Sequence, residues 1–303
     1  MAETQHLVDY LVSAATGADK EGTLVLYTDS GNLISKHLVS GTWTDEETLA
    51  EEARKDSPAC YLLGPTTTLI LYISSTSELR GLQYNKEEEE WTEFESIPAE
   101  QLHSEGNLAA CLYPDNDKEG LFAFFQVPSG ELVCLDQTWS RFTLPAQPLI
   151  GTPLFADFIN NAVHVFYVSK EDHCVHFLRK GNDGWVDAVA TKCTINKTMK
   201  RIMIGLDEKE GLEVYALTPE RELLRINSTE GGTVTIFGTV GAGGKYVASR
   251  ATENAWVPYW PRPGGQQWPG QQYPGQQWPG QRWPGQQWPG QRWPGQQWPG
   301  QQW

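Results

Sequence analysis

The segment 23–43, TLVLYTDSGNLISKHLVSGTW, determines the expected fold of this chain. It contains an apolar run at 23–28, a Ser-Gly-Asn turn at 30–32, a second apolar run from Leu33, and a closing Gly-Thr-Trp. Two runs rich in β-branched and aromatic residues on either side of such a turn are typical of a β-hairpin. The segment therefore predicts two antiparallel strands that lead to Trp43.

The same pattern recurs along the chain with a period of about 48 residues. Runs similar to 23–28 occur at 68–73, 121–127, 162–168 and 211–217, and each is followed by a turn and a further apolar run. The closing aromatic residues are 48, 48 and 46 residues apart, and one more step ends near Thr233; they are Trp43, Trp91, Trp139 and Trp185. Such self-similarity predicts a repeat architecture.

Each unit also begins with an apolar run, at 7–14, 58–64, 107–113, 150–156 and 200–206. These runs contain small residues, which suit an innermost strand. Four short antiparallel strands per unit predict an all-β protein, a β-propeller over residues 1–254, with five blades expected and six as the alternative. The segment 243–251 either starts a sixth blade or ties the end of the ring to the first blade. A helical turn is expected only within 45–55.

The spacing of strands and turns in these hairpins resembles that of the fungal fucose-specific lectins, which are six-bladed propellers. The likeness covers residues 6–250 and lies in spacing more than identity, as in 9–43, which has the inner strand, the aromatic-ended second strand, the turn and the Gly-x-Trp. The resemblance implies a sugar site between adjacent blades, where an arginine on the second strand, a glutamate on the third strand and aromatic rings hold the ligand. Such a clamp offers hydrogen-bond donors and an acceptor to hydroxyl groups.

Carried over residue by residue, the clamp is not retained. The arginine positions hold Leu24, Ile70, Phe122, His164 and Glu213, and the glutamate positions hold Lys36, Gly81, Cys134, His176 and Arg225. Two pairs could still bind a polar ligand: His164 with His176, and Glu213 with Arg225 in reversed roles. The alternative for both is a plain cross-strand pair. The blade tryptophans either pack the blades together or line sites between them.

Composition narrows the classes of partner and activity. All 38 acidic residues lie at or before Glu253, so residues 1–260 carry a charge of −18, which disfavours nucleic acid and anionic membranes. No stretch approaches the roughly 20 apolar residues of a membrane span, and the first residues lack a secretory signal, so a cytoplasmic location is expected.

No catalytic motif is present, which predicts a protein that is not an enzyme and needs no cofactor. Five widely spaced cysteines indicate reduced thiols; a metal site at Cys174 with His173 and His176 is the minor alternative.

The end of the chain has a different composition. After a linker at 255–268, residues 269–303 are seven copies of Pro-Gly-Gln-(Gln/Arg)-(Trp/Tyr), which predict a disordered tail without helix. Its evenly spaced aromatic side chains, with cation-π contacts from Arg282 and Arg292, predict weak multivalent self-association. These aromatic residues are Trp268, Tyr273, Trp278, Trp283, Trp288, Trp293, Trp298 and Trp303. The tail resembles the aromatic Pro/Gly repeats that multimerise one type of galectin; the alternative is a tail that only solvates the terminus.

The sequence therefore predicts a lectin-like propeller that binds a glycan or a protein and is clustered by its tail. The alternative is a structural assembly protein, in which the propeller is an inert spacer and the tail forms a gel or condensate.

Overall fold

The computed structural model describes residues 15–18, 23–39, 42–43, 46–65, 67–115, 118–206, 212–227, 233–241 and 246–249. The chain divides into two units, Met1–Gln266 and Gln267–Trp303, and every described residue lies in the first. The described residues form strands and turns and contain no α-helix. None of the described residues belongs to a helix that is long and apolar enough to cross a membrane. The linker and the repeat tail expected at 255–303 lie outside the described residues.

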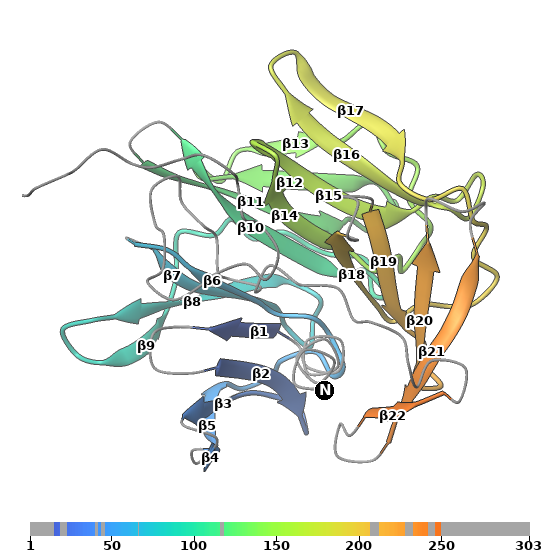
Figure 1. Cartoon of the computed structure of the whole chain (residues 1–303). Coiled ribbons are helices and arrows are strands. Elements are labelled where there is room, and N and C mark those ends of the chain that lie inside the picture. Colours follow the sequence, from blue (N-terminus) through green and yellow to red (C-terminus); the bar gives the residue numbers. More distant parts are fainter. Residues whose placement is uncertain are drawn as a thin grey trace, which may run out of the picture. The chain divides into compact units, whose positions relative to one another are not determined.

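The strands form five antiparallel sheets, which are the five blades of a β-propeller (Figure 1). Blade 1 contains β1 (Ala15–Ala18), β2 (Thr23–Asp29), β3 (Asn32–Val39), β4 (Thr42–Trp43) and β5 (Glu47–Ala50). Blade 2 contains β6 (Cys60–Leu63), β7 (Thr68–Ile73), β8 (Leu79–Asn85) and β9 (Glu90–Glu93). Blade 3 contains β10 (Leu108–Asp115), β11 (Lys118–Gln126), β12 (Leu132–Asp136) and β13 (Arg141–Thr143). Blade 4 contains β14 (Phe155–Ile159), β15 (Ala162–Val168), β16 (Val175–Gly181) and β17 (Gly184–Val189). Blade 5 contains β18 (Arg201–Leu206), β19 (Leu212–Leu217), β20 (Glu222–Asn227), β21 (Val234–Val240) and β22 (Tyr246–Ala248).

The hydrophobic core lies between neighbouring blades, in four clusters. Because side chains alternate across a strand, each sheet presents one face to the preceding blade and the other to the next. Leu24 and Leu26 of blade 1 therefore pack with Ile70 and Tyr72 of blade 2, and equivalent clusters join blades 2 and 3, blades 3 and 4, and blades 4 and 5. We call each such contact zone a junction. A propeller sheet is stable because both of its faces are covered in this way.

Loop side chains add hydrogen bonds between blades. The guanidinium of Arg54, which precedes blade 2, donates to the carbonyl oxygens of His103, Ser104 and Gly106, which precede blade 3. Arg201 at the start of blade 5 donates to the carbonyl oxygen of Asp56 at 3.2 Å. These bonds satisfy loop carbonyls that lack a strand partner. The Arg54 bonds connect consecutive blades, and the Arg201 bond connects blade 5 to the segment before blade 2.

The five-blade expectation is confirmed, and two details of it are wrong. The segment 45–55 holds the strand β5 instead of a helical turn, because 47–50 pairs with the third strand of blade 1. Within 243–251, β22 pairs with β21 of its own blade, so it neither opens a sixth sheet nor joins the first blade. The run 7–14, which was expected to form the innermost strand of blade 1, lies outside the described residues, and β1 begins at Ala15.

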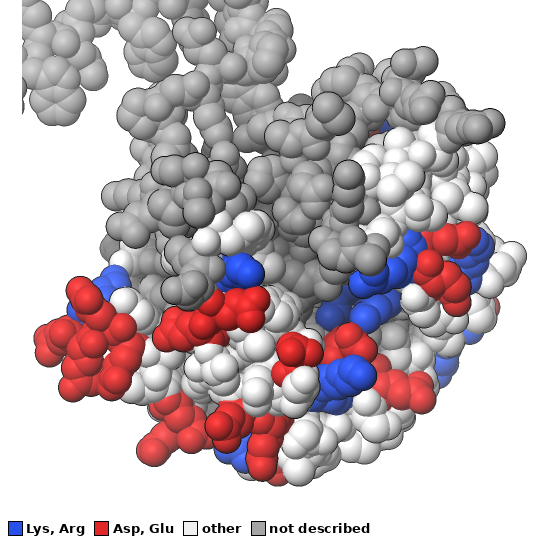
Figure 2. All heavy atoms as spheres, turned by 90° about the horizontal axis from the view of Figure 1, so that it is seen from below, with Lys and Arg blue, Asp and Glu red and all other residues white. Residues whose placement is uncertain are grey.

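Charge is distributed unevenly over the surface. Figure 2 shows acidic side chains gathered on the left of the face seen from below, the side on which β8 and β9 lie in Figure 1. The turn between these two strands and the first residue of β9 have the sequence KEEEE at 86–90. Acidic and basic groups are mixed on the right of the same face.

Candidate functional site

Three of the four blade tryptophans are half-buried packing residues at the junctions. Trp91 packs against the cluster between blades 1 and 2, and Trp139 against that between blades 2 and 3. Trp185 of blade 4 covers blade 3, with its ring 5.5 Å from that of Phe122 and 5.6 Å from that of Phe124, both edge-on. Edge-to-face contacts at such distances stabilise aromatic clusters. These junctions are therefore filled.

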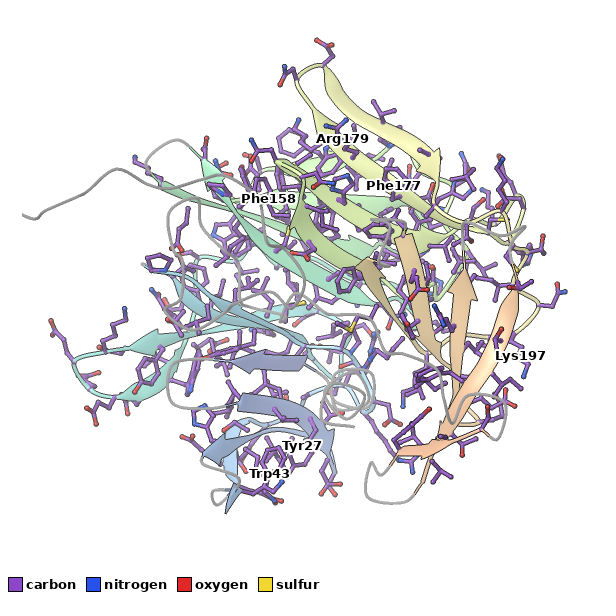
Figure 3. The ribbon with its side chains drawn as sticks, in the orientation of Figure 1. Tyr27, Trp43, Phe158, Phe177, Arg179 and Lys197 are labelled. Carbon is purple, nitrogen blue, oxygen red and sulfur yellow. The ribbon has the colours of Figure 1, made fainter. Side chains whose placement is uncertain are left out.

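Blade 5 has no tryptophan at the corresponding place. The next step of the repeat ends near Thr233, and the sequence at 231–233 is Gly-Gly-Thr. Among the residues that the structure describes, the junction between blades 4 and 5 thus has no counterpart of the indole that covers the three junctions before it. Trp43, in blade 1, is 44% exposed and is the least buried of the four (Figure 3).

The face of blade 4 that looks towards blade 5 carries a polar row. Asp157 on β14 lies opposite His164 on β15, and His164 lies opposite Arg179 on β16. The Asp157 and His164 side chains are half-buried, whereas Arg179 is exposed. Residues directly opposite each other in antiparallel strands share one face of the sheet. A carboxylate, an imidazole and a guanidinium therefore follow one another straight across the blade.

An aromatic row runs beside this polar row on the same face. Phe155, Phe166 and Phe177 lie opposite one another on β14, β15 and β16, and successive ring centroids are 6.1 and 5.7 Å apart. The ring of His164 lies 5.5 Å from that of Phe177, so the two rows are in contact. Phe177 is half-buried and lies two residues before Arg179 on β16 (Figure 3). Phe155 and Phe166 are buried in the core, so the accessible part of this face has Phe177 on its apolar side and the polar row on its hydrogen-bonding side.

Burial shifts the pKa values of two groups in the polar row. It raises the pKa of Asp157 to about 6, although the backbone N–H of Phe158 donates to its Oδ1 at 2.8 Å. Burial also lowers the pKa of His164, and the nearby charge of Arg179 acts in the same direction. Desolvation disfavours the charged form of either group. His164 is thus held neutral, with Nδ1 3.0 Å from the carbonyl oxygen of Ala162.

The raised pKa of Asp157 predicts a pH-dependent stability. A carboxyl that binds its proton more tightly in the folded protein adds stability at pH below about 4, and this contribution is lost as the pH rises through about 6. Asp157→Asn keeps an acceptor for Phe158 and has no charge to bury. At pH 7.5 we expect the variant to unfold at a higher temperature than wild type, with a free energy of unfolding that is larger by at most about 3 kcal/mol. At pH 4 we expect the two proteins to be equally stable. Equal unfolding temperatures at both pH values would contradict the assignment.

The expected pairing of His164 with His176 is wrong. His176 lies opposite Tyr167, whose side chain points to the other face from that of His164. The turn of blade 4, closed by the bond from Ser169 N to Cys174 O, is one residue longer than the turn of blade 5, closed from Thr218 N to Glu222 O. A shift of one residue moves a strand's side chains to the opposite face.

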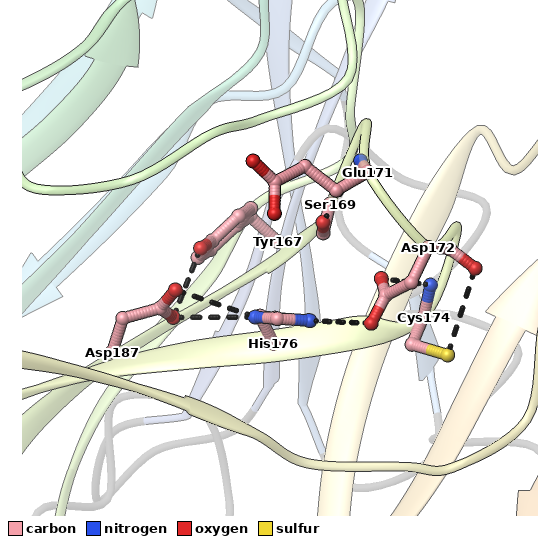
Figure 4. Close-up of polar contacts among 7 residues, drawn as sticks. All are labelled: Tyr167, Ser169, Glu171, Asp172, Cys174, His176 and Asp187. Carbon is pink, nitrogen blue, oxygen red and sulfur yellow. Dashed lines mark hydrogen bonds and ion pairs between the residues drawn. The ribbon is translucent and has the colours of Figure 1, made fainter.

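His176 instead belongs to a polar network on the face towards blade 3 (Figure 4). Its Nε2 is 3.0 Å from Asp172 Oδ2, and its Nδ1 is 3.4 Å from both carboxylate oxygens of Asp187. The hydroxyl of Tyr167 donates to Asp187 Oδ1 at 2.9 Å. The described residues contain no group of three or more His, Cys, Asp or Glu side chains suited to a metal ion.

Glu213 and Arg225 do meet, as the sequence indicated. The Arg225 guanidinium donates to Glu213 Oε1, and the Tyr215 hydroxyl donates to Glu213 Oε2 at 2.8 Å. The Glu213 side chain is 1% exposed and that of Arg225 30% exposed. Both oxygens of a buried carboxylate are therefore occupied within blade 5, which is the arrangement of a cross-strand pair that stabilises the sheet.

Removing one member of this pair is expected to destabilise blade 5. Arg225→Met leaves the buried Glu213 with the tyrosine bond but without its cation, and we expect the free energy of unfolding to fall by about 2–3 kcal/mol, less than for a fully buried pair. The double variant Glu213→Leu, Arg225→Met removes the stranded charge and should recover part of the loss. Urea unfolding measures both. A single variant as stable as wild type would show that the pair contributes nothing.

In the first three blades, the second-strand residues at the positions of the expected clamp are apolar and buried. When the ends of the second strands are superposed, the clamp positions are Leu24 with Ser35, Leu69 with Gly81, Phe122 with Cys134, and His164 with Phe177. Lys36 and Ile70 are therefore wrong, because each lies on the opposite face. The second-strand residues of blades 1 to 3 are apolar and are buried beneath the next blade.

The residues that the sequence analysis missed are Asp157, Phe177 and Arg179. Their signal is the alternation Phe155, Asp157 on β14 and Phe177, Arg179 on β16, which places each pair on one face. This alternation can be interpreted only once the turn length of blade 4 is known, because that length sets which residues of β15 and β16 lie opposite each other. Of the predicted site residues that the structure describes, His164 alone belongs to this surface.

No protein-family model and no curated protein matches the chain. Among solved structures, AofleA from Arthrobotrys oligospora is similar at a TM-score of 0.57 and 15% identity, over 78% of this chain and 74% of that one. The SapL1 lectin in complex with α-methyl fucoside gives 0.53 and 12%, over 79% and 83%. The Aleuria aurantia lectin AAL, in complex with Fucα1-6GlcNAc, gives 0.52 and 11%, over 76% and 75%. The chain thus has a lectin-like β-propeller fold.

Proposed function

We propose that the protein is a carbohydrate-binding lectin whose sugar site is the blade 4 face at the junction of blades 4 and 5. The observation that carries this proposal is the pair of adjacent rows, polar and aromatic, at a junction that lacks the covering tryptophan. The SapL1 lectin and the AAL lectin, which have the same fold, bind a fucoside and a fucosyl disaccharide in their complexes, which supports a sugar as the ligand class.

The chemistry of the surface suits a pyranose. The C–H face of the sugar packs on Phe177, and the hydroxyl groups on its edge meet the polar row. Arg179 donates hydrogen bonds, ionised Asp157 accepts them, and neutral His164 exchanges one through Nε2. Binding sites of this type combine apolar contact with a few polar groups that fix the orientation. Nothing in this arrangement requires a metal or cofactor, and the proposed activity is binding without turnover.

The second part of the proposal assigns clustering to the repeat tail. One aromatic contact contributes on the order of 0.5–1.5 kcal/mol, which is too little to hold two chains together. Eight linked aromatic residues turn later contacts into intramolecular ones and raise the overall affinity. A chain with one weak sugar site then gains avidity on a surface that displays many copies of its ligand.

A glycan array tests both parts together. The tail-serine variant carries Trp268→Ser, Tyr273→Ser, Trp278→Ser, Trp283→Ser, Trp288→Ser, Trp293→Ser, Trp298→Ser and Trp303→Ser. The full chain should bind a defined set of glycans, and the variant should bind the same set more weakly. An array on which the full chain binds no glycan contradicts the sugar site, and equal signals from the two proteins contradict clustering.

A further inference from the structure

We propose that the junction of blades 4 and 5 receives a tryptophan from the repeat tail of a second copy of the chain. This inference rests on the proposed clustering by the tail and names the surface on which the tail acts. Aromatic contacts between tails alone would not involve the propeller. A docked tryptophan would instead link the tail of one copy to the propeller of another.

Exposed apolar side chains lie on the two sheet faces that border this junction. On β17 of blade 4, Val186 shares the face of Arg179 and is 63% exposed. On β21 of blade 5, Val234 and Ile236 share the face of the core residues Ile226 and Leu224 and are 40% and 42% exposed. Isolated exposed apolar residues need no explanation, but three on facing sheets beside a half-buried phenylalanine mark an interaction surface.

The junction of blades 3 and 4 shows what this surface lacks. There, Trp185 packs edge-on against Phe122 and Phe124 of the second strand of blade 3. His164 and Phe166 hold the equivalent places on the second strand of blade 4, counted back from the turn. Blade 5 supplies no indole to cover them, because its sequence at 231–233 is Gly-Gly-Thr. Phe166 is 1% exposed and already covered in the core between blades 4 and 5, so an indole from elsewhere would pack on the half-buried His164 and Phe177.

The repeat tail is the occupant that the sequence itself supplies. It places a tryptophan or tyrosine at every fifth residue between Trp268 and Trp303, each followed by Pro-Gly except the last. The charged residues of the tail are the cations Arg282 and Arg292, whereas residues 1–260 carry a net charge of −18. Long-range electrostatic attraction therefore favours contact between the tail of one copy and the propeller of another. A patch that binds a different segment of the next molecule gives head-to-tail assembly, which grows in chains.

The test uses the full-length tail-serine variant as receptor and the synthetic peptide of residues 283–293, WPGQQWPGQRW, as probe. Fluorescence anisotropy of the labelled peptide gives its dissociation constant. Val186→Ser with Ile236→Ser in the receptor should weaken binding at least 10-fold. The matched control is Val189→Ser with Phe142→Ser, which alters side chains 48% and 47% exposed outside this junction and should change binding less than 2-fold. Since the sugar and the indole both contact Phe177, a bound glycan should displace the peptide.

Each outcome separates this inference from the proposed clustering. If the peptide does not bind the receptor while the wild-type chain still forms oligomers, the tails associate with one another and the docking inference is overturned. Equal weakening by both pairs of substitutions places the contact elsewhere and overturns it too. If the wild-type chain forms no oligomers at all, clustering itself fails, whatever the peptide does.

Discussion

Phe124→Ala is expected to lower the free energy of unfolding by about 3–5 kcal/mol, the usual effect of truncating a buried phenylalanine. Phe124 is fully buried at the junction of blades 3 and 4, where its ring meets those of Phe122 and Trp185. Its removal opens a cavity beneath the tryptophan and weakens the contact between two blades. Since blades depend on their neighbours for coverage, we expect one cooperative transition at a lower temperature or urea concentration.

The matched substitution is Phe142→Ala in the same blade. Phe142 is 47% exposed on β13, so its loss removes little buried surface and should change stability by less than about 1 kcal/mol. Similar losses from the two variants would mean that the junction is not packed as described. They would also undermine the argument that three junctions are closed to ligand.

The tail-serine variant is expected to show the second large effect. Light scattering of the wild-type chain should give a mass that rises with concentration above the 33.9 kDa of one chain, whereas the variant should stay at the mass of its own single chain. The physical reason is that serine removes every aromatic contact from the repeats but keeps their Pro-Gly spacing. Eight Gln→Ser substitutions in the same repeats provide the control and should leave association intact. A wild-type mass that is independent of concentration, or unchanged in the serine variant, contradicts clustering.

Much of the fold could be predicted from the sequence because each blade repeats one local signal. The apolar runs at 68–73 and 162–168 coincide with β7 and β15, and the run at 121–127 falls within one residue of the end of β11. Strands at the edges of the sheets were harder to predict. The acidic segment 45–55 suggests a helical turn by its composition, yet 47–50 pairs with β3 because an edge strand there leaves backbone groups to be satisfied.

The candidate site could be predicted less well, since it depends on register. Glu213 and Arg225 were paired correctly because their hairpin has the turn length assumed for all blades. The extra turn residue of blade 4, where His173 adopts φ of 58°, turns His176 away and brings Phe177 and Arg179 to the face of His164. A single additional residue in the turn therefore determines which side chains meet, and the periodicity of the sequence does not reveal that residue.

The most direct test of the account is the affinity of Arg179→Ala for the strongest glycan found on the array. Lys180→Ala is the control, because Lys180 is the next residue on β16, is also exposed, and points to the opposite face. Isothermal titration calorimetry with the tail-serine background isolates the single site. We expect at least a 10-fold loss of affinity for Arg179→Ala and less than a 2-fold change for Lys180→Ala. Wild-type affinity in Arg179→Ala, or equal losses in both variants, would show that the blade 4 face does not hold the sugar.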